Sequence, residues 1–280
     1  MILENKIGIM QGRLLPKYQG RYQAHPVGYW QDEFIFANKL GLDCIEFILN
    51  YDECEKNPLL NPDGIESIKK TEELSGVKVL SICADYFMQA PIHSNNFNVV
   101  DASIAILDRL ISNASLLNVS DIIIPCVDKS SFKNKNEIDN FINNIKPNVK
   151  SAEIAGINIC LETDLAPKVF ANMIDLIGSK NVMINYDIGN SAAQGYDSEE
   201  EFKSYGNKIK HIHVKDRLLG SASVSLGTGN ANFPKIFRLL EKYDYQDTII
   251  FETFRDNEGI EIFKKQYNWF KKKIDNFERK

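Results

Sequence analysis

Eight short apolar segments, rich in isoleucine and valine, alternate along the chain with longer stretches of helical periodicity. This alternation constrains the fold more than any other feature, because a strand, a helix and a further strand form a βαβ unit with parallel strands. The expected strands are residues 6–10, 43–48, 77–84, 121–127, 157–162, 181–187, 208–214 and 248–253. The expected helices lie near residues 30–40, 62–75, 98–117, 136–153, 167–178, 198–206, 232–243 and 258–276.

Eight such units in 280 residues fit a (β/α)8 TIM barrel, and we expect residues 1–280 to form it as a single domain. A doubly wound parallel sheet is the alternative architecture. It is disfavoured because no GxGxxG turn follows the first expected strand. We find no linker, low-complexity tract or tandem repeat beyond the βα period itself.

Charge and cysteine content narrow the possible partners and the compartment. The net charge is −5 at pH 7, which argues against a nucleic-acid partner because backbone binding needs a basic face. No apolar run approaches the roughly 18–20 residues of a membrane span, and the N-terminus lacks the pattern of a signal peptide. The five cysteines are scattered singly without a CxxC pair, which favours reduced thiols in the cytoplasm. A homo-oligomer is compatible with this composition.

The last four expected strands each end in an ionisable side chain. The active site of a barrel forms at the carboxyl ends of its strands, so the last inward-pointing residue of each strand is a candidate site residue. Side chains alternate between the two faces of a strand, and this alternation selects Glu162, Asp187, His213 and Glu252. A lone carboxylate at a strand end is commonly a salt-bridge partner. Four ionisable groups at one rim instead indicate that the four side chains bind one common ion or molecule.

A cluster of anions in a cleft is costly unless a cation neutralises it, so the four side chains predict a metal site. Carboxylate and imidazole ligands without thiolate suit Mn²⁺, Mg²⁺, Co²⁺ or Fe²⁺ better than a structural zinc site. We expect a divalent ion, Mn²⁺, Mg²⁺, Co²⁺ or Zn²⁺. His211 precedes His213 by two residues on the same face and lies one layer deeper. We expect it to support the ligands from behind rather than to bind the metal.

Several short motifs together resemble those of one known family. They are "CLET", "YDIGN", "HIHVKD", "LGTGNANF" and "IIFET". They look like the motifs of the xylose-isomerase-like TIM barrels, the sugar isomerase and epimerase superfamily. "YDIGNSAA", "HVKD" and the glycine loop at Leu226–Asn230 before "FPKIFRLLEKYDY" are most similar to the L-ribulose- and L-xylulose-5-phosphate 3-epimerase branch. The resemblance covers nearly the whole chain.

The resemblance implies a metal-dependent epimerase or isomerase acting on a small sugar or sugar phosphate. It places the metal ligands on Glu162, Asp187, His213 and Glu252, the same four residues that the strand ends select. Glu162 and Glu252 would also remove and return a proton next to a ketose carbonyl, through an enediolate. Two departures bear on the substrate. The segment 8–26 is long and basic, and Asn190 stands where several relatives carry histidine.

Three other functions use the same fold. A dehydratase of the inositol-catabolism type would use the same ligands. An apurinic endonuclease of type IV is disfavoured, because its three zinc ions need more histidines than the four present here and the chain is acidic. A non-catalytic sugar-binding protein is disfavoured, because a site that no longer catalyses a reaction does not need all four metal ligands.

Substrate contacts are expected from side chains near the same rim. Arg13, Lys215 and Arg217 could bind a phosphate or carboxylate group, although each could equally be a solvated surface charge. Glu46 could orient substrate hydroxyls or serve the structure, and Asn190 is a further candidate. The glycine loop at 227–229 would let backbone amides approach an anion, although loop glycines usually only permit a turn.

Overall fold

The computed structural model describes residues 4–279. Its eight strands are all parallel where their register is defined, and they close into a barrel in the order β1-β2-β3-β4-β5-β6-β7-β8. The expected barrel is therefore confirmed and the doubly wound sheet is wrong. The strands are β1 (Ile7–Met10), β2 (Cys44–Ile48), β3 (Lys78–Cys83), β4 (Asp121–Cys126), β5 (Asn158–Thr163), β6 (Val182–Asp187), β7 (Ile209–Val214) and β8 (Ile249–Phe251).

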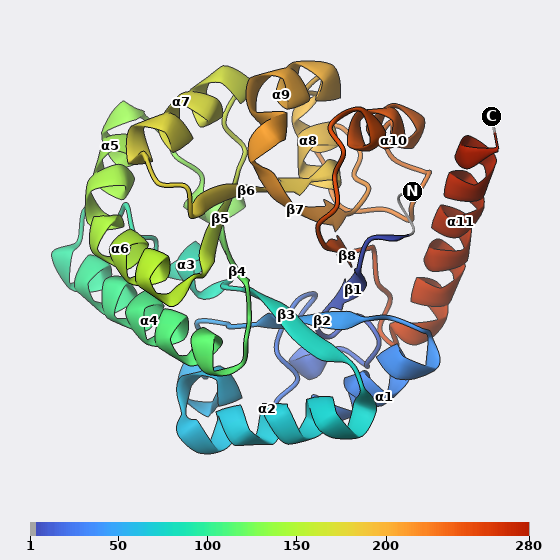
Figure 1. Cartoon of the computed structure of the whole chain (residues 1–280), viewed down its shortest axis with the longest axis horizontal. Helices are drawn as coiled ribbons and strands as arrows, with labels where there is room; N and C mark the ends of the chain where they lie inside the picture. The colour runs from blue at the N-terminus through green and yellow to red at the C-terminus, as the bar shows by residue number, and fades with distance from the viewer. Residues whose placement is uncertain (1–3, 280) are drawn as a thin grey trace. The chain divides into compact units, whose positions relative to one another are not determined.

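Helices connect successive strands, as Figure 1 shows along the chain. The α-helices are α1 (Gln31–Lys39), α2 (Pro62–Ser75), α3 (Tyr86–Gln89), α4 (Phe97–Leu116), α5 (Lys135–Asn144), α6 (Lys146–Ala155), α7 (Pro167–Ile177), α8 (Ile188–Gln194), α9 (Ser198–Tyr205), α10 (Phe233–Lys242) and α11 (Ile260–Glu278). Short 3-10 turns lie at η2 (Tyr18–Gly20), η3 (Cys54–Lys56), η4 (Pro58–Leu60), η5 (Asp128–Ser130) and η6 (Gly206–Lys208).

Two expected elements differ from those observed. The helix expected over 136–153 is two helices, α5 and α6, which meet at Ile145. Pro147 lies in the first turn of α6, where its missing N–H costs no bond, whereas a continuous helix would need that donor. The strand expected to reach residue 253 ends at Phe251. Glu252 therefore lies just past β8, although its backbone N–H still donates to Val214 of β7.

The chain divides into two compact units, one of residues 1–45 with 185–280 and one of residues 46–184. In the first, β1 pairs with β8 and β8 pairs with β7 (Figure 1). Close packing of this sheet needs Gly8, because a Cβ there would lie 2.4 Å from Cys44 Sγ. In the second, β3, β4 and β5 form a continuous parallel ladder, and α4 packs against α6. A single domain for the whole chain stays a prediction.

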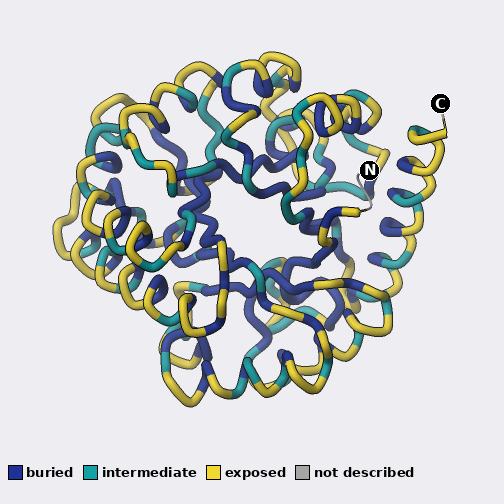
Figure 2. The backbone as a smooth tube through the Cα atoms, in the orientation of Figure 1, coloured by how far each residue is buried: buried dark blue, intermediate teal, exposed yellow. Residues whose placement is uncertain are grey.

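Burial follows the strands in each unit, as the dark segments of Figure 2 show. All six residues of β4 are buried, which is typical of a parallel strand covered on both faces. The five cysteines are free, and Cys54 alone among them is partly exposed. This agrees with the expected reduced thiols. Within residues 4–279, no helix combines the length and the apolar character that crossing a membrane requires.

Candidate metal centre and active site

Three of the four expected ligands converge in the first unit. Asp187 is the last residue of β6, His213 the last but one of β7, and Glu252 follows β8 directly. His213 Nδ1 lies 3.0 Å from Glu252 Oε2 and 4.0 Å from Asp187 Oδ2. The three side chains are between 1 and 7 % exposed. A buried cluster of histidine, aspartate and glutamate therefore exists at these strand ends.

The turn from β6 into α8 fixes Asp187 from two sides. Its Oδ1 accepts the backbone N–H of Asn190 at 2.8 Å and so caps α8, which leaves Oδ2 to face His213. On the opposite face of β6, the Tyr186 hydroxyl donates to the buried carboxylate of Glu201 at 2.9 Å. The Tyr205 hydroxyl donates to the other oxygen of Glu201, also at 2.9 Å. These bonds hold the end of β6 against α9.

The two histidines of β7 have different surroundings. The amide nitrogen of Asn185 lies 3.1 Å from His213 Nδ1, the nitrogen that also lies 3.0 Å from Glu252 Oε2, so the protonation of this ring nitrogen decides which of the two it hydrogen-bonds. His211 is fully buried, and its ring meets that of His213 edge-on with centroids 5.5 Å apart. This placement agrees with the deeper, supporting position expected for His211. Its role stays a prediction.

Two cations bind the outer oxygen of Glu252. Lys215 Nζ lies 2.8 Å from Glu252 Oε1 and 3.2 Å from Asp187 Oδ2. Arg13 Nη2 lies 3.4 Å from the same Oε1. Burial alone would raise the pKa of Glu252, but Lys215, His213 and Arg13 together lower it below its usual value. Burial raises the pKa of Asp187, and Lys215 opposes that rise.

A buried clamp holds the loop that carries Arg13. The Glu33 carboxylate of α1 accepts the backbone N–H groups of Gly12 at 2.6 Å and Leu14 at 2.9 Å. From the other side, the Arg255 guanidinium donates to the carbonyls of Gly12 at 2.5 Å and Leu15 at 2.6 Å. Arg13 between them is 1 % exposed, so it is not the solvated charge that the sequence left open.

The glycine loop before α10 binds an internal carboxylate. Asp216 Oδ2 accepts the N–H groups of Gly227 at 2.8 Å and Gly229 at 2.9 Å, and Oδ1 accepts that of Ala231 at 3.1 Å. A Cβ at Gly229 would lie 2.1 Å from Asp216 Oδ1, so only glycine fits there. The expectation that these amides approach a substrate anion is wrong, because Asp216 already occupies them.

The loop that Asp216 holds positions Arg217 against α8. Arg217 Nη1 donates to Asn190 Oδ1 at 2.7 Å, and its Nε donates to the Ser221 carbonyl at 2.9 Å. The structure thus joins two candidate substrate-binding residues, Arg217 and Asn190, to each other. Asn190 is also tied through its backbone to Asp187. Asn190 thus contacts Asp187 of the cluster, and Arg217 is linked to the cluster through Asn190.

The second unit holds the two remaining candidates. Glu162 is the last but one residue of β5 and is 5 % exposed. Burial raises the pKa of the Cys126 thiol, and the nearby Glu162 charge adds to that rise. Glu46 lies in the middle of β2, not at its end as the sequence suggested. It is fully buried and accepts a hydrogen bond from Ser81 Oγ of β3 at 2.6 Å, so it has a structural partner.

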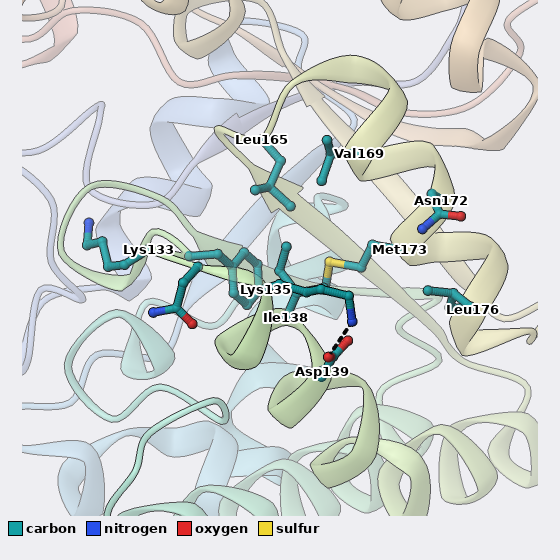
Figure 3. A pocket seen from close by; sticks show the side chains of 11 residues that line it. Lys133, Lys135, Ile138, Asp139, Leu165, Val169, Asn172, Met173 and Leu176 are labelled. Carbon is teal, nitrogen blue, oxygen red and sulfur yellow. Dashed lines mark hydrogen bonds and ion pairs between the residues drawn. The ribbon is translucent and has the colours of Figure 1, made fainter.

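A cavity of about 400 Å³ also lies in the second unit, between α5 and α7 (Figure 3). Its wall is largely apolar, and the ion pair between Lys135 and Asp139 crosses one edge at 2.6 Å. None of the expected site residues lines it. Its lining residues are Phe132, Lys133, Asn134, Lys135, Ile138, Asp139, Leu165, Val169, Asn172, Met173 and Leu176.

The converging side chains fit a divalent ion. Two ligand atoms that each lie about 2.1 Å from one ion are about 3 Å apart at a right angle and about 4 Å apart when nearly opposite. The 3.0 Å and 4.0 Å separations around His213 Nδ1 fall in this range. Two carboxylates and one imidazole are also the donors that Mn²⁺, Mg²⁺, Co²⁺ and Zn²⁺ accept. The donor set and its spacing are thus compatible with the expected cofactor.

Comparison with known proteins identifies the family. The model of the xylose isomerase-like TIM barrel matches residues 34–273, so the chain belongs to this family. Its relatives include SgbU of Haemophilus influenzae, which carries the name of an L-ribulose-5-phosphate 3-epimerase. The two are 25 % identical over 244 residues, which cover 81 % of this chain and 84 % of the relative. The resemblance stated from the motifs is therefore confirmed.

Solved structures of low identity share the fold. D-psicose 3-epimerase in the presence of D-fructose superposes with a TM-score of 0.71 and 18 % identity, covering 91 % of this chain and 87 % of that chain. The IolI protein with a binding zinc atom gives a TM-score of 0.73 and 15 % identity, covering 94 % and 95 %. These homologues and neighbours include sugar epimerases, which are isomerases, the enzyme class expected from the sequence.

Sequence reasoning missed two side chains that shape this region. Asp216, which follows the histidines in "HVKD", is not among the expected site residues. Glu33 shares a helical face with Ala37, which is also buried. A carboxylate on the apolar face of a helix is a signal that could have marked it in advance, because such a group needs buried partners.

Proposed function

We propose that this protein is a divalent-metal-dependent epimerase or isomerase of a ketose or ketose phosphate. The observation that carries the proposal is the convergence of Asp187, His213 and Glu252 at strand ends, in a chain of the xylose isomerase-like family. A metal-dependent dehydratase of a sugar or inositol ketone is the alternative that the same donors permit. The relatives named as epimerases favour the first reading.

Glu162 completes the proposed ligand set. It lies at the carboxyl end of β5, the strand next to β6 in the barrel, and parallel strands present their carboxyl ends to the same rim. Asp187 Oδ2, His213 Nδ1 and Glu252 Oε2 supply the other donors. When bound, the ion polarises the carbonyl and neighbouring hydroxyl oxygens of a ketose and lowers the barrier to removing the adjacent proton.

Two carboxylates move the proton in this proposal. One of Glu162 and Glu252 removes it from one face of the sugar, and the other returns it on the opposite face, so the configuration inverts. The cations on Glu252 Oε1 keep that group ionised and fix its orientation, because Lys215 and Arg13 both contact the oxygen that faces away from His213. Glu252 is thereby ionised in the resting protein, which is the form that a general base requires.

Polar groups around the cluster orient the substrate. Arg217 and Asn190 form one bonded pair beside Asp187 and offer donors to a hydroxyl or an anionic group. Arg13 and Lys215 supply positive charge on the other side of Glu252. Glu46, which accepts a hydrogen bond from Ser81, is proposed as a further contact to a substrate hydroxyl. In this proposal, these contacts determine whether the substrate is a sugar or a sugar phosphate.

Turnover in D₂O tests the reaction. A panel of ketoses and ketose phosphates with Mn²⁺ is monitored by NMR for new stereoisomers. We expect the epimer to carry deuterium on the carbon next to the carbonyl, because the removed proton exchanges with solvent. An active enzyme whose product carries no solvent deuterium would indicate direct hydride transfer and overturn the two-carboxylate proposal. Formation of a dehydrated product would instead support the dehydratase.

Conservative variants separate the two carboxylates. Glu162→Gln and Glu252→Gln should each lower turnover by about 10²–10⁴-fold, the usual effect of removing a general acid or base. Each variant can still exchange deuterium from the one epimer whose face retains its carboxylate. Glu261→Gln is the matched control, because Glu261 is a surface residue paired with Lys264. If all three variants turn over like the wild type, the assigned roles are wrong.

A further inference from the structure

Lys215 is built into the cluster rather than placed at its edge. It is the first residue after β7, its side chain is 12 % exposed, and its ammonium bridges Asp187 and Glu252. The aliphatic stem crosses α8 at Gly189, where an added Cβ would lie 2.7 Å from Lys215 Cγ. The glycine of "YDIGN" therefore leaves room for this lysine, and its path to the carboxylates is fixed by packing.

The charge of Lys215 bears on the same oxygen that a metal would use. Asp187 Oδ2 faces His213 Nδ1 at 4.0 Å and Lys215 Nζ at 3.2 Å. An ion bound about 2.1 Å from this oxygen would lie within about 5 Å of the ammonium. In a buried site such like charges repel far more strongly than they do in water. The ammonium and the metal thus compete for the same negative charge.

We propose that Lys215 is a built-in counter-ion that stabilises the metal-free site and lowers its affinity for the divalent ion. Without metal, Lys215 neutralises two carboxylates whose burial would otherwise be costly. With metal, the same positive charge weakens binding and makes the ion exchangeable. This inference rests on the proposed metal dependence, and it assigns Lys215 a role that substrate binding alone would not require.

The test measures metal affinity and the stability of the metal-free protein, without substrate. Lys215→Met removes the charge and keeps an unbranched stem that can pass Gly189, whereas Lys215→Arg keeps the charge. We expect Lys215→Met to bind Mn²⁺ at least tenfold more tightly than wild type in a calorimetric titration, because it removes a positive charge about 5 Å from the bound ion. Its metal-free melting temperature should fall, because Asp187 and Glu252 lose the cation that bridges them.

Two further variants separate the effect of the Lys215 charge from a general loss of structure. Lys215→Arg should keep a Mn²⁺ dissociation constant close to that of the wild type. Lys210→Met is the matched control, because Lys210 lies in β7, the strand that leads to Lys215, and pairs with the partly exposed Asp247. It should leave the Mn²⁺ affinity unchanged.

The outcomes distinguish this inference from the proposed function. Tight binding by Lys215→Met where wild type binds weakly or not at all supports the counter-ion. Equal or weaker binding by Lys215→Met, with clear binding by wild type, overturns the counter-ion and leaves the proposed metal dependence in place. Absence of Mn²⁺ binding in the wild type and in Lys215→Met overturns both.

Discussion

Replacing Asp216 by asparagine tests how the loop between β7 and α10 is held. The carboxylate accepts three backbone N–H groups, two on Oδ2 and one on Oδ1, and the residue is fully buried. An asparagine can direct its single oxygen at Gly227 and Gly229 or at Ala231, but not at both. In the better orientation, two charge-assisted bonds become neutral, at about 1 kcal/mol each, and one amide faces a donor, at about 1–3 kcal/mol.

We therefore expect Asp216→Asn to lower the free energy of unfolding by about 3–5 kcal/mol, and Asp216→Ala by at least about 5 kcal/mol because all three hydrogen bonds are lost. Urea unfolding of the metal-free proteins, followed by circular dichroism, measures the change. Asp247→Asn is the control, since this aspartate pairs with Lys210 at the surface and should contribute less than about 1 kcal/mol. A loss below about 1 kcal/mol for Asp216→Asn would refute the three hydrogen bonds to Asp216 as a source of stability.

Three further predictions concern the metal and pH. Asp187→Ala and His213→Ala should abolish the rise in melting temperature that Mn²⁺ causes, because a ligand that binds only the folded state stabilises it by mass action. His211→Ala should keep that rise with a 10–100-fold weaker affinity, and its complete loss would contradict the supporting role. Burial raises the pKa of Glu33 to about 7 from 4.5, so the folded chain retains a proton that the unfolded chain releases. The protonated Glu33 therefore stabilises the fold fully below pH 4.5, and this contribution to the free energy of unfolding should decline by at most about 3 kcal/mol as the pH rises to 7. Unfolding measured as a function of pH should show this decline in the wild type and not in Glu33→Gln.

The barrel could be predicted because its strands are buried on both faces. Such strands appear in the sequence as continuous apolar runs, of which Ile122–Ile124 in β4 is the clearest, and the helices between them supply the parallel connection. The convergence of Asp187 with His213 followed from side-chain alternation within two strands of known direction. These inferences need only local periodicity and the topology of the fold.

The contacts that loop side chains make around the site could not be predicted in the same way. Lys215 and Asp216 are adjacent charges in one loop, yet one points at the cluster and the other supports a glycine turn. The conformation of a loop, not the period of a strand, decides which is which. The short helix α8 was also missed, because seven residues begun by the Asp187 cap carry too little apolar pattern to be distinguished from a turn.

The clamp on the first loop has a consequence for how the chain is made. Glu33 is synthesised early, but Arg255, which grips the same loop from the other side, follows more than 200 residues later. The pairing of β1 with β8 spans a similar interval. During synthesis at about 5–20 residues per second, the first strand must wait for tens of seconds with its edge unpaired. A chaperone that shields this edge on the ribosome would therefore be of most use for the first strand, and truncation before Ile249, which removes β8, should trap a nascent chain that cannot complete its barrel.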